Sequence, residues 1–267
     1  MANKDLFEKL WGYYTQLNPT VQKIHDTFTK LGENVLNDHI ALRTFNDSRV
    51  NIKMLEKPFL EAGFKEVGTY SFEEKKLKAK HYELPNNAET PRVFISELLI
   101  EEFSSDLQNT ITNLLDSVKN ELYKANDLIF RGNIWGTPSY ETYHKLRKES
   151  EYAAWLYVYG FIANHFTVSI NHLKKLQTIE EVNEHLKNNG FKLNTSGGEI
   201  KGTKQDLLQQ SSTLADNITV SFIEGNYEIP SCYYEFAVRY PDKDGNIFSG
   251  FLAKSADKIF ESTNYHN

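Results

Sequence analysis

Two similar stretches of the sequence each carry a histidine in a run of alternating apolar and small or polar residues. The first is Asp38-His39-Ile40-Ala41-Leu42-Arg43-Thr44-Phe45, and the second is Asn164-His165-Phe166-Thr167-Val168-Ser169-Ile170. A helical pattern follows each run and ends in Gly-Phe, at Gly63-Phe64 and at Gly190-Phe191. This repetition indicates a duplicated unit. One histidine per copy can bring two imidazoles together as ligands of a metal ion.

A carboxylate on a third expected strand completes a candidate ligand set. Side chains alternate across a strand, so Glu235 shares one face with Tyr233, Ala237 and Arg239. The same rule groups His39 with Ala41 and Arg43, and it groups His165 with Ala163, Thr167 and Ser169. Small residues beside polar ones favour a cavity wall over a solvated surface, although a water-exposed sheet face explains any one stretch equally well. Two histidines and one carboxylate form the ligand set of non-heme Fe(II) oxygenases.

The composition is that of an ordinary globular protein and narrows the classes of partner. The chain has 267 residues, a formal net charge of −6 and a single cysteine, Cys232. A negative net charge gives no electrostatic basis for binding nucleic acid, and one cysteine cannot form an intramolecular disulfide. The first residues lack the apolar core of a signal peptide, and the most apolar run, 153–163, is too short to span a bilayer. We therefore expect a cytoplasmic protein without nucleic-acid or membrane partners.

Periodicity and capping signals predict an α+β chain with four segments. Two helices are expected over 1–36, and a first module over 37–103 has the order strand, helix (50–62) and three strands. A helical insert follows over 104–160, with Ser104 as one N-cap and Thr137-Pro138 as a second helix start. The second module, 161–267, has a helix opened by the capping box of Thr178 and Glu181. Its further strands are expected at 190–191, 218–223, 232–240 and 247–252.

Several motifs along the chain resemble the DUF1338 family, whose characterised members are 2-oxoadipate dioxygenase/decarboxylases, also called 2-hydroxyglutarate synthases. The motifs are Asn37-Asp38-His39-Ile40-Ala41-Leu42-Arg43-Thr44-Phe45, Asn164-His165-Phe166-Thr167, Gln210-Ser211-Ser212-Thr213, Tyr234-Glu235-Phe236, Gly250-Phe251 and Ser255-Ala256-Asp257-Lys258-Ile259-Phe260-Glu261-Ser262-Thr263. The resemblance covers the chain from about Asp38 to its C-terminus. It implies a vicinal-oxygen-chelate type fold, in which two βαβββ modules form a half-open mixed β-barrel.

The resemblance also implies a reaction and a set of residues. It implies an Fe(II) site formed by His39, His165 and Glu235, conversion of 2-oxoadipate to 2-hydroxyglutarate with O₂ and release of CO₂, and a place in lysine breakdown. It assigns the substrate arginine to Arg43. That residue lies four positions after His39 on the same strand face, where its guanidinium can take the far carboxylate of a diacid in a bidentate pair. A salt bridge inside the barrel is the other interpretation of Arg43. Ser255 can bind a substrate carboxylate or cap a helix.

Two other functions are compatible with the same fold and similar ligands. One is metal-dependent catalysis of a related kind, by a glyoxalase-like isomerase or lyase or by an extradiol-type dioxygenase. The other is a module that sequesters a ligand without catalysis. A fourth protein carboxylate on the metal favours non-redox chemistry, and Glu97 is the candidate for it, with a role outside the direct ligand set as the alternative.

Overall fold

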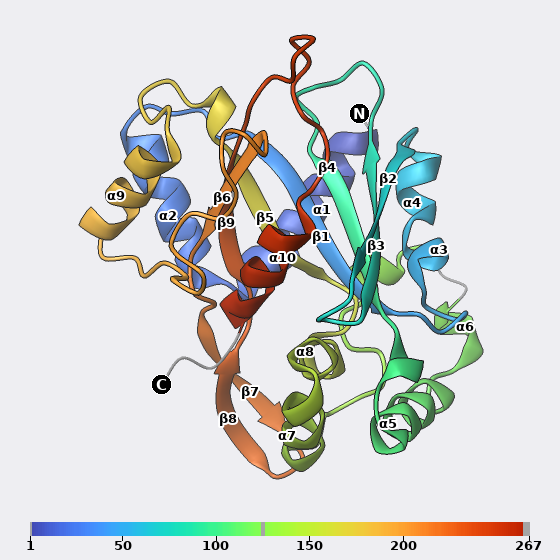
Figure 1. The fold of residues 1–267 in the computed structure, drawn as a ribbon. Coiled ribbons are helices and arrows are strands. Elements are labelled where there is room, and N and C mark those ends of the chain that lie inside the picture. Colours follow the sequence, from blue (N-terminus) through green and yellow to red (C-terminus); the bar gives the residue numbers. More distant parts are fainter. Residues whose placement is uncertain (1, 124–125, 264–267) are drawn as a thin grey trace.

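One curled, mixed β-sheet organises the protein, and the computed structural model describes residues 2–123 and 126–263 of the chain (Figure 1). The strand order in this sheet is β2-β3-β4-β1-β5-β9-β6. The strands are β1 (Asn37–Phe45), β2 (Lys65–Phe72), β3 (Leu77–Glu83), β4 (Arg92–Leu98), β5 (Ala163–Ser169), β6 (Leu208–Ser212) and β9 (Tyr233–Arg239). The last four residues of the predicted second module lie outside the described residues.

The centre of the sheet joins the two modules. Strand β1 pairs in parallel with β4, β5 pairs in parallel with β9, and β1 and β5 pair antiparallel with each other. The strands that carry His39, His165 and Glu235 are therefore neighbours in the middle of one sheet. The predicted α+β class with a half-open mixed barrel is confirmed.

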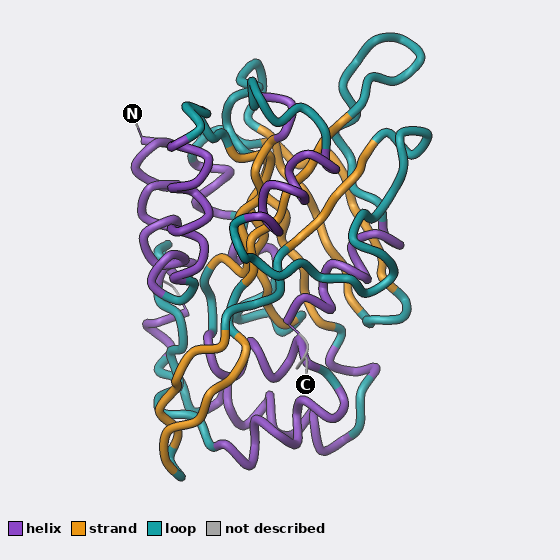
Figure 2. Tube along the Cα trace, turned by 90° about the vertical axis from the view of Figure 1, so that its left-hand side faces the viewer, coloured by secondary structure: helices purple, strands orange, loops and turns teal. Residues whose placement is uncertain are grey.

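The second module departs from the first in its outer strands. The strand predicted at 190–191 is absent, and only an isolated bridge from Leu193 to Thr213 remains there. The segment after it, Asn194-Thr195-Ser196-Gly197-Gly198, has low strand propensity. The strand predicted at 218–223 forms as β7 (Asn217–Phe222), but it pairs only with β8 (Gly225–Pro230) in a separate hairpin below the main sheet (Figures 1 and 2). The strand predicted at 247–252 is reduced to a bridge between Pro241 and Ile247.

Helices cover the convex face of the sheet and close its lower end, while one helix crosses the concave face (Figure 1). Apolar residues of β5 and β9 pack against Trp11, Tyr14 and Phe28 on the convex side. The longer helices are α1 (Ala2–Gln16), α2 (Pro19–Lys30), α5 (Ser105–Asp116), α7 (Tyr140–Glu149), α8 (Glu151–Tyr159), α9 (Ile179–Asn188) and α10 (Ala253–Phe260). Helix α10 lies over the concave face, where the candidate ligands project. Among the described residues, none of the helices combines the length and the apolar character that a bilayer crossing requires.

Helix boundaries follow local chemistry, with two corrections. The helix predicted over 50–62 is divided into α3 (Ile52–Leu55) and α4 (Lys57–Glu61), because Pro58 lacks the amide hydrogen that a continuous helix needs. Helix α7 starts after Ser139, whose hydroxyl accepts from Thr142 N, and not at Thr137-Pro138. The predicted caps at Ser104 and Thr178 are confirmed, the latter with Glu181 in a full capping box. The remaining short helix is α6 (Asn120–Tyr123).

Gly160 ends α8 in a conformation that only glycine adopts without strain. Its φ is +64°, and a Cβ built there would lie 2.1 Å from the carbonyl oxygen of Gly132. Gly160→Ala is expected to lower the free energy of unfolding by at least about 3 kcal/mol, because backbone strain and a backbone clash add together. Gly190→Ala is the matched control, with φ +83° and no atom near its Cβ. Denaturant unfolding of both variants measures the difference, and equal losses would contradict the clash.

Candidate metal centre

His39, His165 and Glu235 meet on the concave face of the sheet. The Nε2 atoms of the two histidines lie 3.4 Å apart. Glu235 Oε1 lies 3.6 Å from His39 Nε2, and Glu235 Oε2 lies 3.2 Å from His165 Nε2. All three residues are at most 4% exposed, and their ligand atoms lie within 4.8 Å of one another. The predicted convergence of these residues is therefore present in the structure.

The register of the central strands produces this convergence. Across β1, β5 and β9, one row of the sheet contains His39, Thr167 and Glu235, and the next contains Ala41, His165 and Tyr233. Side chains in neighbouring rows of one face are close enough to touch. The two small residues Ala41 and Ala163 lie between the ligands and Arg43, so they leave the face open in that direction.

Each histidine is held by the residue immediately before it. His39 Nδ1 donates to Asp38 Oδ1 at 2.8 Å, and His165 Nδ1 donates to Asn164 Oδ1 at 3.2 Å. Neighbouring side chains on a regular strand point to opposite faces, but the β1–β5 register shifts at both Asp38 and Asn164. These shifts let the preceding side chain reach its histidine. With Nδ1 protonated, each neutral ring presents the lone pair of Nε2 to the centre.

The centre contains acceptor atoms that a cation would satisfy. Two Nε2 lone pairs and a carboxylate converge, and Glu235 Oε2 is buried without a hydrogen-bond donor among the described residues. Gln210 Nε2 donates to Glu235 Oε1, and the Thr167 hydroxyl lies 3.1 Å from His39 Nε2. Two imidazoles and one carboxylate on one side of an ion fit a divalent transition metal with open positions.

Burial sets the protonation of the centre when it holds no cation. Burial raises the pKa of Glu235 to about 8, although the hydrogen bond from Gln210 opposes the rise. Burial lowers the pKa of His39, and it holds the pKa of His165 well below its usual range, with His39 and Arg43 adding to the effect. Near pH 7 the two imidazoles are therefore neutral and Glu235 carries a proton. Binding of a cation must displace that proton.

An ion-pair network holds Asp38, the residue that orients His39. Arg239 donates to both carboxylate oxygens of Asp38, at 2.7 and 2.9 Å, and Arg92 approaches at 3.4 Å. Although burial alone would raise the pKa of Asp38, Arg239 and His39 hold it well below its usual range. Arg239 also donates to the carbonyls of Phe248 and Gly250, which fixes the loop carrying Phe251. The Phe251 ring lies edge-on to the His39 ring, with 4.8 Å between their centroids.

Asp38→Asn is expected to weaken metal binding about 10-fold and to lower stability by roughly 3 kcal/mol. The amide keeps an acceptor for His39, but it leaves the buried Arg239 charge without its counterion. Asp47→Asn is the matched control, because Asp47 accepts from Arg49 in a partly exposed pair remote from the centre. Metal titration and denaturant unfolding measure both effects. Equal behaviour of the two variants would show that Asp38 does not orient His39.

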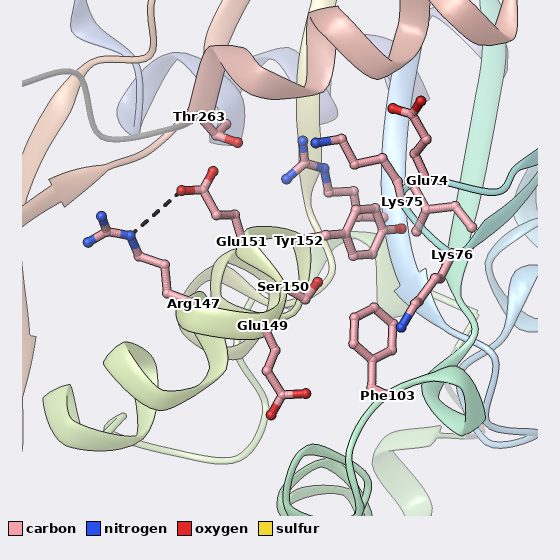
Figure 3. A pocket seen from close by; sticks show the side chains of 12 residues that line it. Glu74, Lys75, Lys76, Phe103, Arg147, Glu149, Ser150, Glu151, Tyr152 and Thr263 are labelled. Atoms are coloured by element: carbon pink, nitrogen blue, oxygen red, sulfur yellow. Dashed lines mark ion pairs between the residues drawn. The ribbon is translucent and has the colours of Figure 1, made fainter.

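Arg43 is fully buried at the inner end of a cavity of about 420 Å³. Its guanidinium lies over the rings of Tyr152 and Trp155, 4.9 and 5.2 Å from their centroids. Figure 3 shows Lys75 and Lys76 on one wall of this cavity, and Arg147 paired with Glu151 on the other. The cavity therefore leads from the surface to Arg43, on the face that carries the candidate ligands.

The structure separates two other candidates from the three ligands. Glu97 pairs with Thr44 in the β1–β4 ladder, on the face opposite His39, and its carboxylate accepts from Ile52 N. Glu97 is therefore outside the ligand cluster. Ser255 is the third residue of α10, so it does not cap that helix. It lines a different cavity from Arg43, together with Lys201 and Lys258, and its contact with substrate stays a prediction.

Sequence reasoning missed the supporting residues of the centre. Asp38, Asn164 and Gln210 hold the three ligands, and Tyr233 stacks on the His165 ring. A signal for two of them is visible in the sequence, because each repeat places an acidic or amide residue directly before its histidine. Metal-bound histidines usually donate their other nitrogen to such a group.

Comparison with known proteins gives concordant matches. The model of a family described as 2-oxoadipate dioxygenase/decarboxylase matches residues 5–245. The chloroplastic 2-oxoadipate dioxygenase/decarboxylase of Arabidopsis thaliana is 36% identical over 275 residues, which cover 94% of this chain and 74% of that protein. A crystal structure from Shewanella frigidimarina is 49% identical, with a TM-score of 0.89, covering 94% of this chain and 98% of that one. The hydroxyglutarate synthase of Oryza sativa, solved in complex with 2-oxoadipate, is 33% identical with a TM-score of 0.91, covering 98% of this chain and 93% of that one.

Proposed function

The chain belongs to the 2-oxoadipate dioxygenase/decarboxylase family, and from this premise we propose that it is a non-heme Fe(II) enzyme that converts 2-oxoadipate and O₂ to 2-hydroxyglutarate and CO₂. The observation that carries the proposal is the buried cluster of His39, His165 and Glu235, whose acceptor atoms converge on one point as the ligands of a divalent cation do. The rice relative, solved with 2-oxoadipate, supports the choice of substrate.

The donor set supports iron as the metal. Two neutral imidazoles and one carboxylate leave several coordination positions open, which is the arrangement that Fe(II) oxygenases use for substrate and O₂. When bound, Fe(II) supplies the one-electron chemistry that lets O₂ react with a 2-oxo acid. The atoms of the overall reaction balance, because the six carbons of 2-oxoadipate become five in the product and one in CO₂, and both oxygen atoms of O₂ are retained.

The protein's own residues hold and orient the diacid. We place its 2-oxo acid end at the three ligands and its far carboxylate at Arg43, with the chain passing over Ala41 and Ala163. The guanidinium offers a planar pair of donors, which matches a carboxylate in a bidentate ion pair. Burial of Arg43, Tyr152 and Trp155 excludes water around that pair and strengthens it. Fixing both ends of the substrate holds its reacting carbons in one position.

The cluster favours this function over a glyoxalase-like isomerase. Within the described part of the chain, no fourth carboxylate or imidazole joins the three ligands, and Glu97 lies on the other face of the sheet. Three protein ligands leave more room for O₂ beside a chelating substrate than four would. The alternative is a module that sequesters a ligand without catalysis, and a measurement of turnover distinguishes it from an enzyme.

Anaerobic loading with Fe(II), followed by oxygen-consumption measurements with a panel of 2-oxo acids, tests the proposal. We expect O₂ uptake with 2-oxoadipate, one CO₂ released per O₂ consumed, and much slower uptake with 2-oxo monoacids. Product analysis should give 2-hydroxyglutarate. Absence of uptake with every acid would leave an isomerase or a binding module. Uptake without CO₂ release would point to a different dioxygenase reaction.

A further inference from the structure

Tyr233 lies on the concave face between the candidate ligands and Arg43. It shares a row of the sheet with Ala41 and His165, and its ring stacks on the His165 ring at 4.7 Å and 28°. Its side chain is fully buried, and its backbone carbonyl accepts a hydrogen bond from the Tyr14 hydroxyl. The ring is therefore fixed at both the sheet and the imidazole, so the position of its hydroxyl is also fixed.

The Arg43 guanidinium lies within hydrogen-bonding reach of the Tyr233 hydroxyl, and no acceptor for the proton of that hydroxyl is present among the residues that the structure describes. A guanidinium only donates hydrogen bonds, so the proton of the Tyr233 hydroxyl remains available for an acceptor on a ligand. A buried hydroxyl whose proton has no acceptor is unfavourable and uncommon in folded proteins. Beside an arginine and a route from the surface, such a donor fits a negatively charged ligand.

We propose that the Tyr233 hydroxyl donates a hydrogen bond to the far carboxylate of the substrate, beside Arg43, and so selects 2-oxo diacids over 2-oxo monoacids. This inference rests on the proposed function, since it assigns a residue to the same substrate site. The guanidinium supplies charge and two donors in one plane, and the phenol supplies one donor from a rigid ring. A monoacid of equal length has no acceptor for either group.

Tyr233→Phe removes only the hydroxyl and keeps the ring on His165. Tyr234→Phe is a matched control, because Tyr234 is also fully buried with an unsatisfied hydroxyl, but it faces the opposite side of the sheet. Dissociation constants for 2-oxoadipate and 2-oxohexanoate are measured by calorimetry on protein loaded with Ni²⁺, so that binding is read without turnover. Metal affinity is measured in the same experiment series.

For Tyr233→Phe we expect binding of 2-oxoadipate to weaken by about 10- to 100-fold, because one hydrogen bond to a charged group is lost. Binding of 2-oxohexanoate and of the metal should change less than about 2-fold, and Tyr234→Phe should change none of the three. Equal weakening for both acids, or no weakening for either, would overturn the assignment of Tyr233. The proposed function fails separately, if the wild-type Fe(II) protein consumes no O₂ with 2-oxoadipate.

Discussion

Replacing Glu235 by glutamine is expected to weaken Fe(II) binding by at least about 100-fold and to abolish O₂ consumption with 2-oxoadipate. Loss of a group that only orients a metal ligand costs about 10- to 100-fold in affinity, so loss of a ligand charge should cost more. The amide is nearly the same size as the carboxyl and keeps an acceptor for Gln210. Metal titration under anaerobic conditions and oxygen-electrode assays measure both effects.

The stability of the Glu235→Gln variant distinguishes the loss of a metal ligand from the loss of the fold. The folded-state pKa of Glu235, about 8, lies above the ordinary glutamate pKa of 4.5, so the metal-free folded state binds an extra proton between these two pH values. In the metal-free protein, the contribution of Glu235 to the free energy of unfolding is therefore fully present below pH 4.5 and is lost as the pH rises toward 8. Glutamine removes this penalty, so metal-free Glu235→Gln should be at least as stable as wild type at pH 8. A large loss of stability would contradict this account of the site.

The same protonation makes metal binding depend on pH. Below pH 8, each metal ion that binds must displace the Glu235 proton, so wild-type affinity should fall as the pH is lowered from 8 to 6. Calorimetry in buffers of different ionisation enthalpy counts the released proton. Glu235→Gln should release about one proton fewer per ion than wild type. Equal proton release by both proteins would show that another group holds the proton.

Replacing Arg43 by lysine is expected to raise the KM for 2-oxoadipate by about 10- to 100-fold while leaving Fe(II) bound. Lysine keeps the positive charge but loses the planar pair of donors that a carboxylate fits. The KM for a 2-oxo monoacid of equal length should change little, because that substrate leaves the guanidinium unused. Steady-state oxygen consumption with the two acids, together with metal analysis of the variant, measures the effect.

Arg147→Lys is the matched control for Arg43, because Arg147 lines the same cavity at its more exposed end and pairs with Glu151. Partly exposed ion pairs contribute little, so this variant should behave like wild type with both acids. Unchanged kinetics of Arg43→Lys with 2-oxoadipate would remove Arg43 from the substrate site. In that case the salt bridge inside the barrel becomes the better account of its burial.

The periodic parts of the fold were accessible from sequence. Alternation predicted β1, β5 and β9 with the correct residues on each face, and capping chemistry predicted the starts of α5 and α9. The failures lie where pairing between distant segments decides the outcome. The strand expected at 190–191 is lost, and 217–230 folds into its own hairpin, because a strand exists only when a neighbour takes its hydrogen bonds.

The candidate site, too, was accessible from sequence only in part. His39, His165 and Glu235 were identified from the duplication and the strand faces, together with a family resemblance, and the structure brings their ligand atoms together. Tyr233 was placed on the correct face, but nothing in the sequence set its hydroxyl beside Arg43. Ser255 was grouped with the substrate residues; it lines a cavity other than the one that reaches Arg43, and its contact with substrate stays a prediction. A motif shows that a residue is present near a site, but the direction of its side chain depends on helices packed from elsewhere.

The sequence by itself determined which residue types face one side of the central strands, since alternation is a local property of an extended backbone. Tertiary structure alone decided that Asp38 and Asn164 turn toward their histidines. That turn depends on register shifts between β1 and β5, which are separated by more than a hundred residues in the chain. Tertiary structure also decided that Glu97 lies apart from the metal ligands, because the pairing of β4 with β1 fixes the face of the sheet on which its carboxylate lies.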